Sequence, residues 1–102
     1  MKIVNFAEKN SELNRFVAEI RDIHIQQDRL RFRKNLERIG EVMSYEISKD
    51  FRYSEKLVTT PLGTARVNTA DDKIVIGTIL RAGIPYHQGF LNYFDRAENA
   101  FV

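Results

Sequence analysis

The sequence contains no cysteine and only two histidines, His24 and His87, among its 102 residues. Without cysteine the chain cannot form disulfides or a cysteine-ligated zinc or iron–sulfur site, and two histidines are too few for a histidine-rich metal site. No run of 18 apolar residues is present, so the sequence predicts no transmembrane helix. The opening stretch Met1–Phe6 is too short and too polar to be a signal peptide. We therefore expect a cytoplasmic protein with no membrane segment.

Glycine and proline are also scarce, with five and two residues respectively, well below their average combined usage of about 12%. This shortage predicts long regular elements joined by few tight turns. Sixteen Lys and Arg residues against fourteen Asp and Glu leave a net charge of +2, so no strong overall field would draw the chain onto nucleic acid. The composition, 43% apolar and 29% charged, is typical of a folded globular chain.

Two stretches in the first half have the spacing of amphipathic helices. The first follows Asn10-Ser11, either of which can serve as N-cap, and carries apolar residues at helical spacing: Leu13, Phe16, Val17 and Ile20. The second carries one apolar stripe through four turns: Phe32, Leu36, Ile39, Met43 and Ile47. Gly40 interrupts this helix at a cost of about 1 kcal/mol relative to Ala, and close packing against a neighbour is the usual reason for such a glycine.

The second half has the pattern of strands. Residues 56–60 and 64–68 are polar and rich in threonine, and they flank a Pro61-Leu62-Gly63 turn of type I character, which predicts an exposed hairpin arm. The apolar run 74–80 suits a strand buried on both faces, as in a parallel sheet. Pro85 then opens a short helix predicted to end at Phe94, residues 95–99 are predicted as a loop, and another apolar run begins at Ala100.

One buried strand and three residues of a second cannot form a sheet that is covered on both faces. The sequence therefore predicts the first half of an α/β domain, cut inside a strand. We expect a single incomplete domain with a helical part over 1–54, a β-hairpin arm over 55–70 and the start of a parallel-sheet core over 71–102.

The turn after Leu80 is the best candidate site, because ligands of open α/β sheets bind beyond the carboxyl ends of the strands. Arg81 offers a planar fork of donors that matches phosphate oxygens. Ala82 and Gly83 let backbone N–H groups approach an anion closely, and the helix near Pro85 directs its positive end the same way. In the alternative interpretation Gly83 serves only the turn and Arg81 is a solvated charge. The residues alone leave these two interpretations balanced.

For the other candidate functional residues, a structural explanation is favoured over a functional one. The basic run 29–34, extended by Arg38, could clamp nucleic acid phosphates, but a solvated helix face is favoured. His24 is interpreted as structural, because its neighbours are apolar. His87 lies one turn into the helix after the candidate turn, where a ligand role is possible and a structural role is favoured. Asp71-Asp72 is interpreted as a turn at the wrong end of the strand for catalysis.

The segment Thr78-Ile79-Leu80-Arg81-Ala82-Gly83 resembles the pyrophosphate-loop signature of uracil phosphoribosyltransferases. The similarity extends along the chain in the expected order: Met1–Val4, Arg21-Asp22, Arg31–Arg33, Tyr45-Glu46, the polar hairpin and Asp95–Ala97. The resemblance implies the N-terminal half of a type I phosphoribosyltransferase fold, with two N-terminal helices, a β-hairpin arm, the first core parallel strand, and the diphosphate loop and its helix.

The resemblance also implies a function. Members of this family join uracil to 5-phosphoribosyl-1-diphosphate with magnesium, giving UMP and diphosphate in pyrimidine salvage. Arg81, Ala82 and Gly83 would bind the diphosphate, with a non-proline cis peptide at or beside Leu80–Arg81. A homodimer and activation by GTP are further implications.

The resemblance covers only part of such an enzyme. The family's second diphosphate-binding arginine, its ribose 5-phosphate loop and its uracil-reading segment would lie beyond Val102. We therefore expect this chain to be inactive alone and to contain none of the catalytic residues. Two alternatives stay open: a helical RNA- or partner-binding module that uses the basic 29–38 face, and a regulatory half-domain without chemistry.

Overall fold

The computed structural model describes all residues from Met1 to Val102 and contains three α-helices, one short 3-10 helix and four strands. In chain order these are η1 (Phe6–Glu8), α1 (Leu13–Arg21), α2 (Arg29–Ser48), β1 (Tyr53–Thr60), β2 (Gly63–Ala70), β3 (Val75–Thr78), α3 (Ile84–Tyr93) and β4 (Glu98–Phe101). The mixed helix and strand content agrees with the predicted partial α/β fold.

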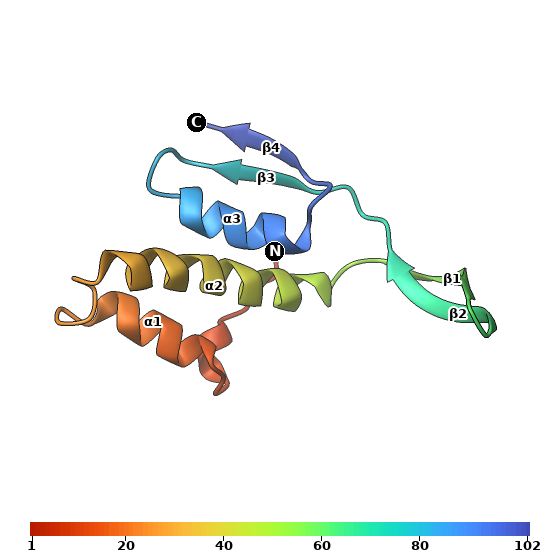
Figure 1. The fold of residues 1–102 in the computed structure, drawn as a ribbon, viewed down its shortest axis with the longest axis horizontal. Coiled ribbons are helices and arrows are strands. Elements are labelled where there is room, and N and C mark those ends of the chain that lie inside the picture. The colour runs from red at the N-terminus through yellow and green to blue at the C-terminus, as the bar shows by residue number, and fades with distance from the viewer.

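The elements stack in layers. Figure 1 shows the two-stranded β3–β4 sheet above α3, then α2 beneath α3, and α1 on the far side of α2. Strands β3 and β4 pair in parallel, with Val75 opposite Glu98 and Thr78 opposite Phe101, and α3 makes the crossover between them. Strands β1 and β2 form a separate antiparallel hairpin that projects away from this stack.

Helix α2 is the central element because neighbours cover it on two sides. Asp28 caps its N-terminus by accepting a hydrogen bond from the Arg31 N–H at 3.1 Å. Besides Ile39, its most buried side chains are polar: Asn35 and Ser44 are both 0% exposed. The Ser44 hydroxyl donates to the Gly40 carbonyl at 2.8 Å, so its burial leaves no unmet donor. The predicted apolar stripe is therefore only part of the buried surface.

The ends of that stripe are less buried than the periodicity predicts. Phe32, Leu36 and Met43 are half-buried, and Ile47 is 41% exposed. The buried surface of α2 is shared between two contacts, with α1 and with α3, so it does not follow one stripe.

The close approach of α2 to α3 explains Gly40. A Cβ built on Gly40 would lie 2.5 Å from the Tyr86 carbonyl oxygen and 3.1 Å from the Cα of Gly89. A Cβ on Gly89 would lie 2.1 Å from the Glu37 carbonyl oxygen. Two facing glycines thus bring the helix backbones into direct contact. The expectation that Gly40 marks close packing is confirmed.

The hairpin arm is confirmed, although it is longer than predicted. Its ladder runs from the Tyr53–Ala70 pair to the Thr60–Gly63 pair, with Pro61 and Leu62 between the strands. Gly63 has φ +131°, a conformation that favours glycine. Nearly every position of both strands is exposed or half-exposed, and Leu62 at the tip is 100% exposed.

Three sequence predictions about the sheet region were wrong in detail. Strand β3 covers only Val75–Thr78 and ends before the turn. Its burial alternates, with Ile76 and Thr78 buried and Val75 and Gly77 exposed, because α3 covers one face of this sheet. The predicted 95–99 loop is shorter than expected, since β4 already begins at Glu98 and its N–H donates to the Ile74 carbonyl.

The glycine contact between α2 and α3 predicts that adding a methyl group at Gly40 lowers the stability of the fold. Gly40→Ala should lower the free energy of unfolding by about 1–3 kcal/mol, because the new Cβ overlaps backbone atoms that cannot move aside easily. Urea denaturation of the chain measures this change. Gly77→Ala is the control, since nothing lies within 4 Å of a Cβ at that position. Equal stability of the Gly40→Ala variant and the parent would contradict the proposed contact.

Tyr86 predicts a change of stability in alkaline solution. Its hydroxyl donates to the Met43 Sδ at 2.7 Å, and burial raises the pKa of Tyr86 above its ordinary value of 10.0. The folded state therefore favours the protonated phenol. The stability that buried Tyr86 contributes is fully present below pH 10 and is lost as the pH rises through the raised pKa. Tyr86→Phe should reduce the loss of stability between about pH 9 and about pH 11. Urea midpoints measure the loss, and Tyr93→Phe, exposed on the same helix, should leave it unchanged.

Candidate functional site

The turn between β3 and α3 is held by its own backbone. The Gly83 N–H donates to the Ile79 carbonyl at 3.2 Å, and the Ile84 N–H donates to the Arg81 carbonyl at 3.2 Å. On the strand side, the Leu80 N–H donates to the Val102 carbonyl at 2.9 Å. The Leu80–Arg81 peptide bond is cis, as the resemblance implies. These contacts fix the conformation of the turn between the strand and the helix.

Two donors in this turn have no acceptor within the chain. The N–H groups of Arg81 and Ala82 make no hydrogen bond, although the N–H groups on either side of them do. Both residues are exposed, and the Arg81 guanidinium has no ion-pair partner. Two free backbone donors beside a free guanidinium form a positive, hydrogen-bond-donating surface that suits an anion such as a phosphate.

The start of α3 adds to this surface. Gly83 is the N-cap residue and offers no side-chain cap, and Pro85 stands in the first turn of the helix. The positive end of the helix therefore faces the turn. Gly83 also cannot be larger, because a Cβ there would lie 2.8 Å from the Thr78 Cγ2 and 3.0 Å from the Ile79 carbonyl oxygen.

The structure buries His87 within α3, whereas Arg81 and Ala82 are exposed. The ring is 5% exposed, and both of its nitrogens are engaged, Nδ1 with the Thr78 hydroxyl and Nε2 with the Asn99 Oδ1 at 2.7 Å. The structural interpretation of His87 is therefore favoured over a ligand contact. No signal in the sequence marks Asn99, because its position opposite Ile76 becomes visible only once the strands are paired.

The interpretation of His24 as a residue held among apolar neighbours was wrong. His24 is exposed in the turn between α1 and α2, and its backbone N–H donates to the Asp22 Oδ1 at 2.8 Å. The adjacent Ile23 and Ile25 are themselves exposed, so no apolar environment surrounds the ring.

A profile of the uracil phosphoribosyltransferase family matches residues 7–102, which is nearly the whole chain. The chain belongs to this family. The resemblance carried by the Thr78–Gly83 segment is thereby confirmed, and the free donors of the turn lie within the matched residues.

Curated relatives give the same family. The uracil phosphoribosyltransferase of Porphyromonas gingivalis is 59% identical over all 102 residues, which make up 47% of that protein. The uracil phosphoribosyltransferase of Methanothermobacter thermautotrophicus is 40% identical over 73 residues, 70% of this chain and 34% of that protein. The Porphyromonas gingivalis protein matches every residue of this chain, and the chain spans about half the length of that protein.

A solved structure has the same fold. The AQ2163 protein from Aquifex aeolicus superimposes with a TM-score of 0.75 and 31% sequence identity. The match covers 91% of this chain and 44% of that one. The layered arrangement in Figure 1 is therefore also present in a longer protein of known structure.

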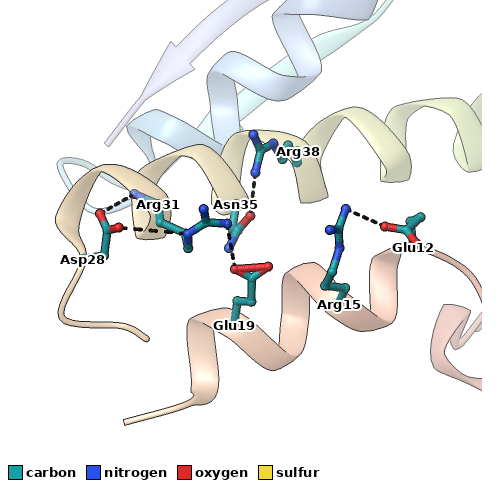
Figure 2. Close-up of polar contacts among 7 residues, drawn as sticks. All are labelled: Glu12, Arg15, Glu19, Asp28, Arg31, Asn35 and Arg38. Carbon is teal, nitrogen blue, oxygen red and sulfur yellow. Dashed lines mark hydrogen bonds and ion pairs between the residues drawn. The ribbon is translucent and has the colours of Figure 1, made fainter. Parts of the chain in front are cut away.

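The basic 29–38 segment contacts other parts of the chain. Figure 2 shows Arg31 reaching from α2 to Glu19 on α1, with an N–O distance of 3.0 Å. Arg38 donates to the Asn35 Oδ1 at 3.1 Å and lies over the ring of Phe16. The contacts of Arg31 with Glu19 and of Arg38 with Phe16 join α1 and α2, so they favour the interpretation of this segment as a helix face over an RNA clamp.

The sequence did not predict a groove that brings basic residues of α2 close to the start of α3. A groove of about 270 Å³ lies between the N-terminal halves of α2 and α3, lined by Leu30, Arg33, Lys34, Glu37, Ile84, Pro85 and Gln88. Figure 1 shows that the start of α2 and the β3–α3 turn lie at the same end of the molecule. Cations of the basic segment therefore add positive charge near the candidate turn.

The resemblance implies magnesium, and side chains of this chain could hold a metal ion by themselves only where several of them cluster. No group of three or more His, Cys, Asp or Glu residues comes together in this chain. Mg²⁺ is generally bound by one or two carboxylates together with substrate phosphates. No helix in the structure has the length and apolar character needed to cross a membrane.

The Arg31–Glu19 pair predicts a difference between two neighbouring arginines. Arg31→Ala should lower the free energy of unfolding by about 0.5–1 kcal/mol, because Glu19, 13% exposed, loses its partner. Arg33→Ala should change it by less than about 0.5 kcal/mol. Thermal denaturation of both variants measures the difference, which should narrow at about 1 M salt. A larger effect at Arg33 would contradict the assignment of the helix contact to Arg31.

Proposed function

We propose that the protein carrying this chain is a uracil phosphoribosyltransferase. It would transfer the phosphoribosyl group of 5-phosphoribosyl-1-diphosphate to uracil, giving UMP and diphosphate, a step of pyrimidine salvage. The family membership supports this reaction, and the curated relatives carry the same name. The observation that carries the proposal in this chain is the pair of free N–H groups at Arg81 and Ala82 beside an unpaired guanidinium.

The turn would act on the leaving group. As the bond between C1 and the diphosphate oxygen breaks, negative charge accumulates on the diphosphate. The Arg81 guanidinium and the N–H groups of Arg81 and Ala82 would donate hydrogen bonds to that charge, with Gly83 allowing close approach of the backbone. Donors that are already fixed in position stabilise developing charge without the cost of reorganising solvent. This is electrostatic stabilisation, and it needs no proton transfer from the turn.

Magnesium is proposed to accompany the diphosphate as part of the substrate. The chain shows no donor cluster that would hold the ion by itself, and diphosphate oxygens are ligands that Mg²⁺ prefers. The proposed role of Arg81, Ala82 and Gly83 does not depend on a protein-built metal site.

Other properties implied by the resemblance stay predictions. These are the cytoplasmic location, the homodimer, activation by GTP and the lack of activity of residues 1–102 alone. The division of the chain into a helical part over 1–54, an arm over 55–70 and the start of a sheet core over 71–102 is likewise a proposal, and the hairpin of β1 and β2 supports the arm.

The proposed role of Arg81 predicts a selective loss of diphosphate binding. Arg81→Ala, made in the protein expressed from its entire reading frame, should weaken diphosphate binding about ten- to hundredfold, because one charge-assisted hydrogen bond contributes about 1.5–3 kcal/mol. Uracil recognition should change much less. Calorimetric titration with magnesium diphosphate measures the affinity.

Arg66→Ala is the matched control for this titration. It removes the same charge from the hairpin, at the opposite end of the molecule from the turn. Equal diphosphate affinity of the Arg81→Ala variant and the parent would remove Arg81 from the site.

A further inference from the structure

His87 links three elements through one buried side chain. It lies in the first turn of α3, where its backbone N–H donates to the Gly83 carbonyl at 2.9 Å. Its Nδ1 meets the hydroxyl of Thr78, the last residue of β3, and its Nε2 meets the Asn99 Oδ1 on β4 at 2.7 Å. The ring also packs beside Phe101, with 5.1 Å between ring centroids. His87 thus joins β3, α3 and β4.

The partners determine where the protons lie. The Oδ1 of Asn99 can only accept, so Nε2 of His87 carries a proton and donates it. In the neutral ring Nδ1 is then the acceptor, and the Thr78 hydroxyl must donate to it. This arrangement permits one orientation of the Thr78 side chain, because its hydroxyl is buried and would otherwise lose its only partner.

The orientation of Thr78 matters because its methyl group lies against the turn. The Cγ2 of Thr78 is the atom nearest to a Cβ built on Gly83, at 2.8 Å. Rotation of Thr78 would therefore remove the support beneath the last residue of the turn. His87 holds Thr78, Thr78 supports Gly83, and Gly83 closes the turn through its hydrogen bond to Ile79.

We propose that His87 is a positioning residue that fixes the diphosphate-binding turn through Thr78, without touching the diphosphate. The proposal rests on the proposed function, since it assigns the turn a ligand. Arg81 and Ala82 carry the donors, and the His87–Thr78 hydrogen bond keeps their backbone in the geometry that presents both N–H groups outward. The Asn99 contact orients the ring but does not reach the turn.

The test uses substitutions that separate the two hydrogen bonds of the ring. In the protein expressed from its entire reading frame, His87→Phe keeps an aromatic ring at this position but loses both hydrogen bonds. His87→Asn places an amide oxygen near the position of Nδ1 and can keep the Thr78 contact, whereas His87→Gln places its amide near Nε2 and can keep only the Asn99 contact. Thr78→Val removes the hydroxyl at nearly constant volume.

The expected result is a selective loss of diphosphate affinity. His87→Phe, His87→Gln and Thr78→Val should each weaken magnesium diphosphate binding about tenfold, as loss of one fixing hydrogen bond would. His87→Asn should stay within about twofold of the parent, and the Thr78→Val/His87→Phe double variant should be no weaker than either single variant. The KM for 5-phosphoribosyl-1-diphosphate should rise in parallel while the KM for uracil stays unchanged. Hydrogen exchange at the Gly83 amide, which donates to the Ile79 carbonyl in the parent, should become faster in the weakened variants.

Several outcomes would overturn the proposal. Parent-like diphosphate affinity in His87→Phe would show that His87 has no role in the turn. Additive losses in the double variant would show that His87 does not act through Thr78. An equal rise of the uracil KM would show a general structural effect. If His87→Phe does not fold, Thr78→Val carries the same test. If the folded parent binds no diphosphate, the proposed function itself is contradicted. If parent and variant bind diphosphate equally, only the role of His87 is contradicted. His24→Phe, an exposed histidine, is the control and should leave every readout unchanged.

Discussion

The contact between Gly40 and Gly89 is the constraint on which the arrangement of the layers depends. Helix α2 carries α1 on one side and α3 on the other, and α3 carries the β3–β4 sheet and the turn. Because neither glycine leaves room for a Cβ, the two backbones meet directly, and backbone atoms limit the distance between α2 and α3 at this point. Backbone contact is less adjustable than side-chain packing, so it fixes the position of α3 firmly.

From α3 the constraint passes to the turn. His87 and Gly89 lie in the same helix. His87 is hydrogen-bonded to Thr78 at the end of β3, and Gly89 packs against the backbone of α2. The backbone hydrogen bonds of the turn leave the N–H groups of Arg81 and Ala82 exposed and without an acceptor in the chain. The proposed anion-binding surface consists mostly of backbone donors, which agrees with the small residues at Ala82 and Gly83.

Much of this could be predicted from the sequence because local rules determine it. Helical spacing placed α1 and α2, the Pro61–Gly63 turn placed the hairpin, and the Thr78–Gly83 segment identified the family. Burial could not be predicted equally well, because it depends on which elements meet. Asn35 and Ser44 are fully buried since α2 has neighbours on two sides, a fact that no periodicity shows. The His87–Asn99 bond likewise depends on the register of two parallel strands.

The central claim is that the outward N–H groups of the β3–α3 turn bind diphosphate, and amide resonances report on this directly. In the protein expressed from its entire reading frame, titration with magnesium diphosphate should shift the backbone amide signals of Arg81 and Ala82 most, with smaller shifts at Gly83 and Tyr86. The amides of the hairpin, at the opposite end of the molecule, should stay in place. Saturable shifts confined to the basic 29–38 segment, with Arg81 and Ala82 unmoved, would contradict the account.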